Sequence, residues 1–379
     1  MSAVHAIVRS VSDWLASPAV ISVLFPRRPK SFSWSGAGAI LIVKLDEIGD
    51  FVLVTPFLRE LRRQAPQARI TLVVKPAVLN LAETCPYVDR VLVYDGRTEG
   101  LRLWQLRRQW RAWRLAWREL QPAHFDVAVL PRWGEDAYNA THLAVYSRAR
   151  ALVAYTEAAT DAKRRMNARF DRLLTHVVPA DILCHEVTHN LRLLERYGRP
   201  WQSDTLELWL TEADRAHAAR LLPGDGPFAA LAPGALDPVR RWPVDRFEAF
   251  ATWLHAKHGL TSVIFGSTQD PACAGTIDLR GRTSLREATA TLARCRLFVG
   301  NDTSLKHLAA AVGLPVVEIS GFPLRGNPNH ANSPARFGAW GTPHRILQPD
   351  VPPGPLAIDL IPLSAAQTAV EALISVPRP

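Results

Sequence analysis

The chain has few cysteines, and they lie far apart. Only four occur in 379 residues, and no two of them form a C-x-x-C pair. This spacing fits neither a zinc cluster nor a disulfide framework. Scattered cysteines are typical of buried thiols in a reducing compartment, so we expect a cytoplasmic protein.

The sequence also lacks a long apolar run. A helix that spans a bilayer needs about 18 or more consecutive uncharged apolar residues, and no stretch of the sequence is that long. Residues 1–25 lack the basic start of a signal peptide, and Arg9 and Asp13 interrupt their apolar character. Because apolar residues recur there at helical spacing, we expect residues 1–38 to be an N-terminal extension. It is either a short amphipathic, interfacial helix with a basic flank or a frayed terminus.

Acidic residues are outnumbered by basic ones, which gives a formal net charge of +10. A field of this sign attracts nucleic acid, acidic lipid headgroups or phosphorylated glycans. No helix-turn-helix, RRM or zinc-finger pattern occurs, so no nucleic-acid partner is expected. The hydrophobic content of 48% and charged content of 21% are ordinary for a soluble globular protein, and 379 residues suit two domains.

Strand-like and helix-like segments alternate in two series. The expected strands lie near residues 39–45, 69–75, 89–94, 125–130 and 150–155, and then near 228–232, 261–265, 276–279, 296–300 and 315–319. Such alternation predicts two α/β domains, each with a doubly wound parallel sheet covered by helices on both faces. The expected limits are a first domain at 39–200, a linker region at 201–226, a second domain at 227–362 and a C-terminal helix at 363–379.

The first motif joins a buried strand to a helix and has a carboxylate at the junction. The apolar run at residues 40–43 leads through Gly49 to Asp50 and the helix that follows. Open α/β sheets bind ligands in the crevice at the carboxyl ends of their strands. Asp50 is therefore the first candidate for a chemical role. The alternative is that Asp50 only caps the helix, where its charge suits the helix dipole.

The second motif has the same form. An apolar strand ends at Asp302, and an alanine-rich helix follows Thr303 and Ser304. Small hydroxyl residues at a helix start leave backbone N–H groups free for an anion, such as the phosphates of a nucleotide. His307, one turn into the helix, faces the same way. Taken singly, Asp302 or Thr303 is explained equally well as a helix cap, and His307 as a packed side chain.

A zinc motif is a competing signal. The segment His185-Glu186-Val187-Thr188-His189 satisfies H-E-x-x-H, with two histidines at ligand spacing on a helix and Glu186 as a base. No histidine follows at the spacing of metzincins, and the remaining candidates for a third ligand, Glu207 and Glu212, lie in no recognisable motif. A zinc metallopeptidase is the alternative class of function.

A helix is predicted near residues 99–120, and its part from Leu103 to Leu120 is rich in tryptophan and arginine. One stripe holds Leu103, Leu106, Trp110, Trp113, Trp117 and Leu120, next to Trp104, and a neighbouring stripe holds Arg107, Arg111, Arg114 and Arg118. Tryptophan beside arginine is typical of a surface that meets anionic lipid or glycan phosphates. The alternative is a core-packing helix with a solvated basic face.

Taken together, the two strand–turn–helix motifs resemble glycosyltransferase family 9, the ADP-heptose lipopolysaccharide heptosyltransferases. The matching residues are Gly49-Asp50 with Thr55-Pro56, and the run Asn301-Asp302-Thr303-Ser304-Leu305-Lys306-His307. Supporting matches are Pro233-Gly234-Ala235, Arg241-Trp242-Pro243 and residues 279–285. The resemblance extends over most of residues 39–350.

This resemblance implies a GT-B architecture, in which an acceptor-binding first domain and a nucleotide-sugar-binding second domain, both Rossmann-like, face a central cleft. By the same resemblance, the C-terminal helix packs back on the first domain. It also implies an inverting transfer of heptose from ADP-L-glycero-D-manno-heptose to a lipopolysaccharide inner core or related surface glycan, without a metal or other cofactor. The implied partners are the nucleotide sugar and an anionic glycolipid acceptor, with peripheral contact at the cytoplasmic face of the inner membrane.

The resemblance also assigns roles to residues. Asp50 matches the family's proposed general base, and Arg241, Asp302, Thr303, Ser304 and His307 match its donor site. Acceptor-binding candidates are Lys44, Gly49, Arg107, Arg111, Arg114 and Arg118. Two positions depart from the family, which usually has glycine at Ser304 and lysine at Arg241. A GT-B protein that binds ligand without turnover is therefore a further alternative.

Overall fold

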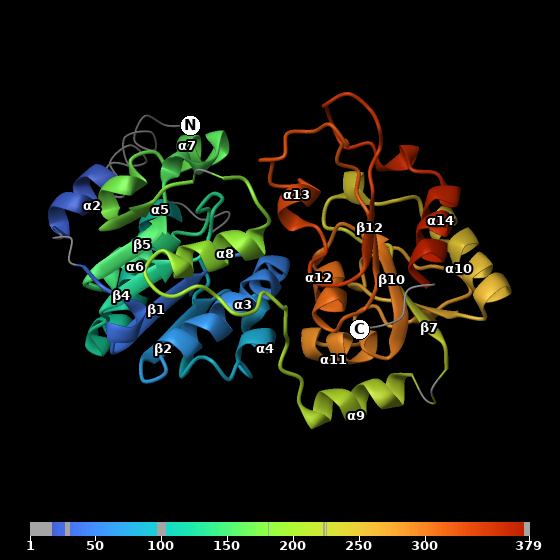
Figure 1. The fold of residues 1–379 in the computed structure, drawn as a ribbon, viewed down its shortest axis with the longest axis horizontal. Helices are drawn as coiled ribbons and strands as arrows, with labels where there is room; N and C mark the ends of the chain where they lie inside the picture. Colours follow the sequence, from blue (N-terminus) through green and yellow to red (C-terminus); the bar gives the residue numbers. More distant parts are fainter. Residues whose placement is uncertain are drawn as a thin grey trace. The chain divides into compact units, whose positions relative to one another are not determined.

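The computed structural model in Figure 1 describes residues 17–26, 31–96, 104–180, 182–222, 224 and 226–374. Its contacts divide the chain into two compact units. The first unit comprises Met1–Glu47 and Phe57–Ser203, and the second comprises Ile48–Pro56 and Asp204–Pro379. In the part of the chain that the structure describes, no helix is long and apolar enough to cross a membrane.

The first unit is built on a six-stranded sheet in which all strands are parallel. The strands are β1 (Ala39–Lys44), β2 (Arg69–Val74), β3 (Arg90–Val93), β4 (Val127–Leu130), β5 (Ala151–Tyr155) and β6 (His176–Val178). The α-helices are α2 (Pro18–Leu24), α3 (Ile48–Gln64), α4 (Leu79–Ala82), α5 (Trp104–Leu115), α6 (Ala140–Tyr146), α7 (Asp161–Met166) and α8 (Glu186–Glu195). Every residue of β1 is buried, which confirms the prediction of a central strand covered on both faces.

The second unit has a parallel sheet of the same size. Its strands are β7 (Phe228–Ala232), β8 (Thr261–Ile264), β9 (Ile277–Asp278), β10 (Cys295–Asn301), β11 (Val316–Ile319) and β12 (His344–Leu347). Its α-helices are α9 (Glu212–Leu221), α10 (Val244–His258), α11 (Leu285–Leu292), α12 (Ser304–Ala311), α13 (Pro334–Phe337) and α14 (Leu363–Ile374). Helices α10 and α14 cover one face of this sheet, and α12 and α13 lie on the other (Figure 1).

Short helical turns connect these elements. They are η1 (Trp34–Gly36), η2 (Pro76–Val78), the π turn η3 (Ala116–Leu120), η4 (Gln121–Ala123), η5 (Glu157–Ala159), η6 (Phe170–Leu173), η7 (Pro238–Arg240) and η8 (Ile358–Leu360). The turn η3 continues α5 directly, so a single helical segment runs from Trp104 to Leu120.

The two sheets share one topology. The strand order is β3-β2-β1-β4-β5-β6 in the first and β12-β11-β10-β7-β8-β9 in the second. Counted from the first strand of each unit, both orders are those of a doubly wound sheet, as predicted. In such a sheet the chain changes direction between two central strands, here β1 and β4 in one unit and β7 and β10 in the other. Ligand sites are expected at the carboxyl ends of those pairs.

The limits of the units differ from the predicted ones at several points. Part of the predicted extension packs into the first unit, since Ile21 and Trp34 are buried and Trp34 Nε1 donates to the Leu194 carbonyl at 2.6 Å. Residues 1–16 and 27–30 of that extension lie outside the described residues. Contacts also group residues 48–56, which were assigned to the first domain, with the second unit.

The predicted linker from Asp204 onward and the terminal helix both belong to the second unit. Helix α9, inside the predicted linker at 201–226, packs on α11, and Arg286 Nε lies 3.1 Å from an Asp214 carboxylate oxygen. The expectation that the C-terminal helix packs back on the first domain is wrong. Ala366, Val370 and Leu373 of α14 are buried in the core of the second unit, because their apolar stripe faces β11, β12 and α10.

Candidate functional site

A buried asparagine joins the loops at the switch point of the second sheet. Asn301, the last residue of β10, is fully buried. Its side-chain nitrogen donates to the carbonyls of Pro233 at 2.8 Å and Gly234 at 3.3 Å, and its oxygen accepts the Trp242 N–H at 3.1 Å. Asn301 thus holds two segments beside the end of β10. One is the loop after β7, and the other is the segment just before α10.

A cluster of four charged residues follows directly. The Lys306 ammonium lies 2.5 Å from an Asp302 carboxylate oxygen and 2.6 Å from a Glu318 oxygen. Arg240 donates to the Asp302 carbonyl at 2.7 Å and also to its carboxylate. Lys306 and Glu318 are buried, whereas the Asp302 side chain keeps 16% of its surface exposed. The cluster therefore reaches the surface through Asp302, just before the first turn of α12.

The charges of this cluster shift one another's titration. Burial alone would raise the pKa of Asp302, but Lys306 and Arg240 hold it below its ordinary value. Burial would lower the pKa of Lys306, but Asp302 and Glu318 raise it. Burial raises the pKa of Glu318 to about 7, against the attraction of Lys306 and with the help of the Asp302 charge. Two carboxylates share one ammonium, and the more deeply buried one retains its proton longer.

This raised pKa makes stability depend on pH. Because the folded state holds the Glu318 proton more tightly than the unfolded chain does, the stabilisation is complete below the ordinary pKa of 4.5 and is lost as the pH rises through about 7. We expect wild type to lose on the order of 2–3 kcal/mol, relative to Glu318→Gln, between about pH 5 and pH 8. Urea unfolding of both proteins at each pH measures this. Equal pH dependence in the two proteins would contradict the raised pKa.

The predicted donor residues lie around the first turn of α12. Thr303 is the N-cap residue, yet its hydroxyl makes no cap bond and is buried without a hydrogen-bond partner among the described residues. Ser304 is the first helical residue and is half-buried, and His307 is buried one turn later. The N–H groups of this turn make the helix start a favourable place for an anion.

Of the two arginines before α10, the predicted donor residue Arg241 is not the one that contacts Asp302. Arg241 donates from Nε to the Ala235 carbonyl at 2.9 Å and lies 3.8 Å from an Asp270 oxygen. Arg240 is the residue that contacts Asp302. Arg240, Lys306 and Glu318 were missed as site residues. Lys306 follows Asp302 by one helical turn, and Glu318 stands in a buried strand, so both left a signal in the sequence.

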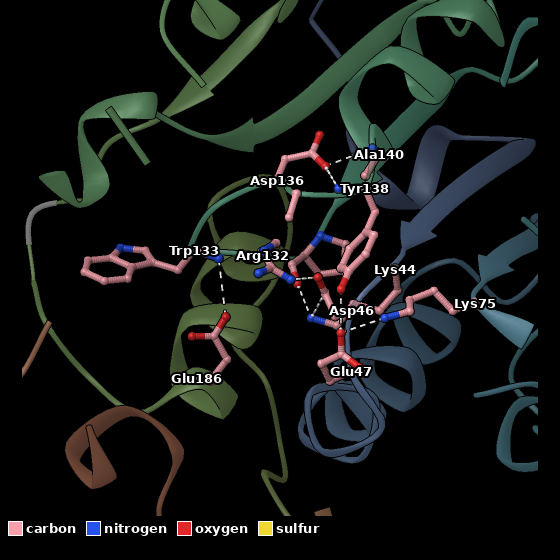
Figure 2. Close-up of polar contacts among 12 residues, drawn as sticks. Lys44, Asp46, Glu47, Lys75, Arg132, Trp133, Asp136, Tyr138, Ala140 and Glu186 are labelled. Atoms are coloured by element: carbon pink, nitrogen blue, oxygen red, sulfur yellow. Dashed lines mark hydrogen bonds and ion pairs between the residues drawn. The ribbon is translucent and has the colours of Figure 1, made fainter. Parts of the chain in front are cut away.

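A second charged cluster lies at the switch point of the first sheet (Figure 2). The Lys44 ammonium is buried at the end of β1, donates to the Pro131 carbonyl at 2.8 Å and lies 2.7 Å from an Asp46 oxygen. Arg132, which follows β4, pairs with the other oxygen of Asp46. Lys44 is therefore enclosed by protein groups, and it holds Asp46 in place beside Arg132. Both of those residues were missed from the sequence.

The β1–α3 junction carries further carboxylates. Glu47 accepts hydrogen bonds from Lys75 at 2.6 Å and Tyr138 at 2.8 Å (Figure 2). Burial would raise the pKa of Glu47, but these two donors hold it below its ordinary value. Gly49 and Asp50 are the second and third residues of α3, and Asp50 is half-buried. Asp50 is thus inside the first turn rather than at the cap, since the helix begins at Ile48.

The remaining acceptor candidates lie on the exposed face of α5 and η3. All four predicted arginines, Arg107, Arg111, Arg114 and Arg118, are exposed. Trp110, Trp113 and Trp117 are also exposed, so the alternative in which these tryptophans pack in the core is wrong. Leu103 lies outside the described residues, as do the side chains of Trp104 and Leu106.

The side chains of the H-E-x-x-H segment have structural contacts. His185 lies outside α8 as its N-cap, where Nδ1 accepts the Val187 N–H at 3.3 Å. His189 is buried, stacks on Trp133 with ring centroids 4.5 Å apart, and both ring nitrogens contact Cys184. Among the described residues no group of three or more His, Cys, Asp or Glu side chains is arranged to hold a metal ion. The zinc metallopeptidase alternative receives no support.

Comparisons with known proteins agree with the fold and the motifs. Residues 144–324 match the family described as glycosyltransferase family 9 (heptosyltransferase). The chain is 32% identical to lipooligosaccharide heptosyltransferase 2 of Haemophilus influenzae over 112 residues, which cover 26% of this chain and 32% of that protein. The matched segment thus spans about a third of that relative's length.

Solved structures match over most of the chain. A glycosyltransferase of family 9 from Veillonella parvula superposes with a TM-score of 0.70 at 19% identity, covering 92% of this chain and 99% of that one. The E. coli ADP-heptose LPS heptosyltransferase II superposes with a TM-score of 0.66 at 19% identity, covering 89% and 98%. The fold is therefore the GT-B-like α/β fold of these structures.

Proposed function

We propose that this chain, of which residues 144–324 match glycosyltransferase family 9, transfers a heptose from ADP-L-glycero-D-manno-heptose to a lipopolysaccharide inner core or a related surface glycan. The names of the similar proteins support the sugar, the nucleotide and the class of acceptor. The proposed place of the reaction is the cytoplasmic face of the inner membrane.

The observation that carries the proposal is the charged cluster at the start of α12. A nucleoside diphosphate needs donors and positive charge that do not have to move on binding. The first turn of α12 has N–H groups, the Thr303 hydroxyl has no partner among the described residues, and Arg240 and Lys306 stand next to Asp302. Asp302 keeps these two cations fixed while its own side chain stays partly exposed.

In the proposed reaction Asp50 is the general base. Its carboxylate takes the proton of an acceptor hydroxyl while that oxygen forms a bond to the anomeric carbon of the heptose. The bond from that carbon to the diphosphate breaks at the same time, and its electron pair leaves with ADP. A single displacement of this kind inverts the anomeric configuration. The α12 N–H groups and nearby cations stabilise the charge that develops on the leaving phosphate.

We propose no metal or other cofactor for this step. The positive charge that a metal would supply comes from Arg240, Arg241 and Lys306, and His307 completes the polar set around Asp302, Thr303 and Ser304. The acceptor is proposed to be an anionic glycolipid. Arg132, one quarter exposed and held by Asp46, is a further cation at the carboxyl edge of the first sheet that suits such an acceptor.

A thermal-shift comparison of nucleotide sugars tests the donor. ADP-heptose at about 100 times its Kd is expected to raise the unfolding temperature by roughly 5–10 °C, because a ligand that binds only the folded form stabilises it. UDP and GDP sugars should give no comparable shift. A shift with UDP-sugars alone would reject the proposed donor. A shift with ADP-heptose but no transfer to any acceptor would favour a binding protein without turnover.

A further inference from the structure

The helical segment α5–η3 presents a surface of exposed tryptophans. Trp110, Trp113 and Trp117 expose 54%, 41% and 54% of their surface. The rings of Trp113 and Trp117 stack with their centroids 5.8 Å apart and their planes 2° apart, so they form one continuous apolar surface. Large exposed side chains gathered in this way mark an interaction site.

The opposite face of the same segment fixes it to the first unit. Ala112, Ala116 and Leu120 are fully buried in the core of that unit. The Tyr94 hydroxyl donates to the carbonyl of Arg108 at 3.2 Å, and the Tyr146 hydroxyl donates to the side chain of Gln109 at 2.7 Å. The tryptophans therefore stand on an anchored helix.

Arginines surround the tryptophans. Arg107, Arg111, Arg114 and Arg118 are all exposed, and the Arg114 guanidinium lies 5.3 Å from the centroid of the Trp110 ring. The single carboxylate of residues 107–120, Glu119, pairs with Arg90, which offsets its charge. The exposed face is therefore both apolar and strongly basic.

A second apolar element is linked to this segment through Tyr146. The ring of Phe25, which follows α2, lies 5.3 Å from the Tyr146 ring, centroid to centroid. Val23 and Leu24 at the end of α2 are 76% and 63% exposed. The first unit thus has exposed apolar side chains on two elements, α2 and α5–η3, whose buried sides pack in the same core.

We propose that the exposed face of α5–η3 docks the protein on an anionic lipid bilayer. Indole rings prefer the headgroup level of a membrane, and arginines are attracted by acidic lipid phosphates. A helix with one face in the protein and an apolar, basic face outside is suited to lie in that interface. A nucleic acid would use the arginines, but it would leave the apolar area of the stacked tryptophans largely unused. Docking of this kind would give the enzyme access to a lipid-anchored acceptor. That purpose rests on the proposed function, whereas lipid binding itself does not.

Co-sedimentation of the full chain with lipid vesicles tests this. Wild type should bind vesicles of phosphatidylcholine mixed with phosphatidylglycerol and bind poorly to phosphatidylcholine alone. Replacing Arg107, Arg111, Arg114 and Arg118 by Gln should weaken binding to the anionic vesicles by roughly 10²- to 10³-fold. The double variant Trp113→Ser, Trp117→Ser should bind vesicles at high salt on the order of tenfold more weakly than wild type, because the apolar contribution persists when salt screens the charges.

A matched control removes the same number of charges from the second unit. The variant with Arg215, Arg220, Arg325 and Arg345 replaced by Gln should bind anionic vesicles like wild type. Equal binding by the two quadruple variants, or no binding by wild type, would overturn lipid docking. Loss of oligonucleotide binding in the α5 variant, without any vesicle binding by wild type, would identify nucleic acid instead. The thermal shift with ADP-heptose, measured on each variant, reports the donor site separately, so failure of docking and failure of the proposed function are distinguishable.

Discussion

Asp50→Asn is expected to lower kcat for heptose transfer by roughly 10²- to 10⁴-fold, which is the usual contribution of a positioned general base. The amide keeps the size of the side chain but cannot accept the acceptor proton. Donor binding is expected to persist, so the thermal shift with ADP-heptose should be unchanged. Initial rates measured with saturating donor and acceptor give kcat directly.

Asp161→Asn is the matched control for that variant. Asp161 is also an acidic residue in the first turn of a helix, and its side chain is 80% exposed. It reproduces the loss of a negative charge near a helix dipole without touching the proposed base. Its kcat should equal that of wild type. Full activity of Asp50→Asn, with donor still bound, would move the role of base to another carboxylate, and Asp46 or Glu47 would be tested next.

Lys306→Met is expected to cost about 3–5 kcal/mol of folding free energy, because it leaves Asp302 and Glu318 without their shared cation in a buried position. Adding Glu318→Met should recover part of that loss, since one of the two uncompensated carboxylates is then absent. Urea unfolding of the two variants measures both effects. The donor-induced thermal shift should also decrease in Lys306→Met.

Lys257→Met provides the comparison with an exposed pair. Lys257 pairs with Glu371, but both side chains are largely in solvent, at 53% and 43% exposure. Its removal should leave the unfolding midpoint nearly unchanged, because exposed ion pairs contribute little. A similar small effect for Lys306→Met would show that the cluster at α12 does not depend on its buried ammonium.

The central strands could be predicted because they are apolar and buried. Five strands in each series were found, including the partly exposed edge strands β3 and β9. The sixth strand was missed in both. β6 has three residues and β12 is only partly buried, so neither produces an apolar run. Both are edge strands, as the sheet orders show. Short edge strands depend on a neighbouring strand more than on their own pattern.

Residue pattern alone could not decide which face of a helix meets the core. In α5–η3 the helical period of the tryptophans was visible, but the buried positions are Ala112, Ala116 and Leu120. Small side chains allow that face to lie close to the core, and the π turn changes the helical phase before Leu120. A constant helical period places Leu120 on the stripe of Trp113 and Trp117, whereas in the structure Leu120 is buried and both tryptophans are exposed.

The candidate site residues that the sequence identified follow the end of a central strand. Asp302, Thr303, Ser304 and His307 lie together at α12 because β10 ends there. Partners from other elements were harder to find. Arg240 and Glu318 reach the same cluster from η7 and β11, and only the sheet order brings those segments together. The H-E-x-x-H pattern is an example of a motif that the fold does not support. It requires both histidines on one helix, but His185 lies outside α8.

The most direct test of the account is transfer itself, measured with purified protein, ADP-heptose and a lipopolysaccharide acceptor that lacks the heptose. Mass spectrometry should show the acceptor heavier by one heptose, with release of ADP in equal amount, and NMR of the new linkage should show inversion at the anomeric carbon. Release of ADP without a modified acceptor, or a product with retained configuration, would contradict the proposal that an acceptor hydroxyl activated by Asp50 displaces the diphosphate in one step.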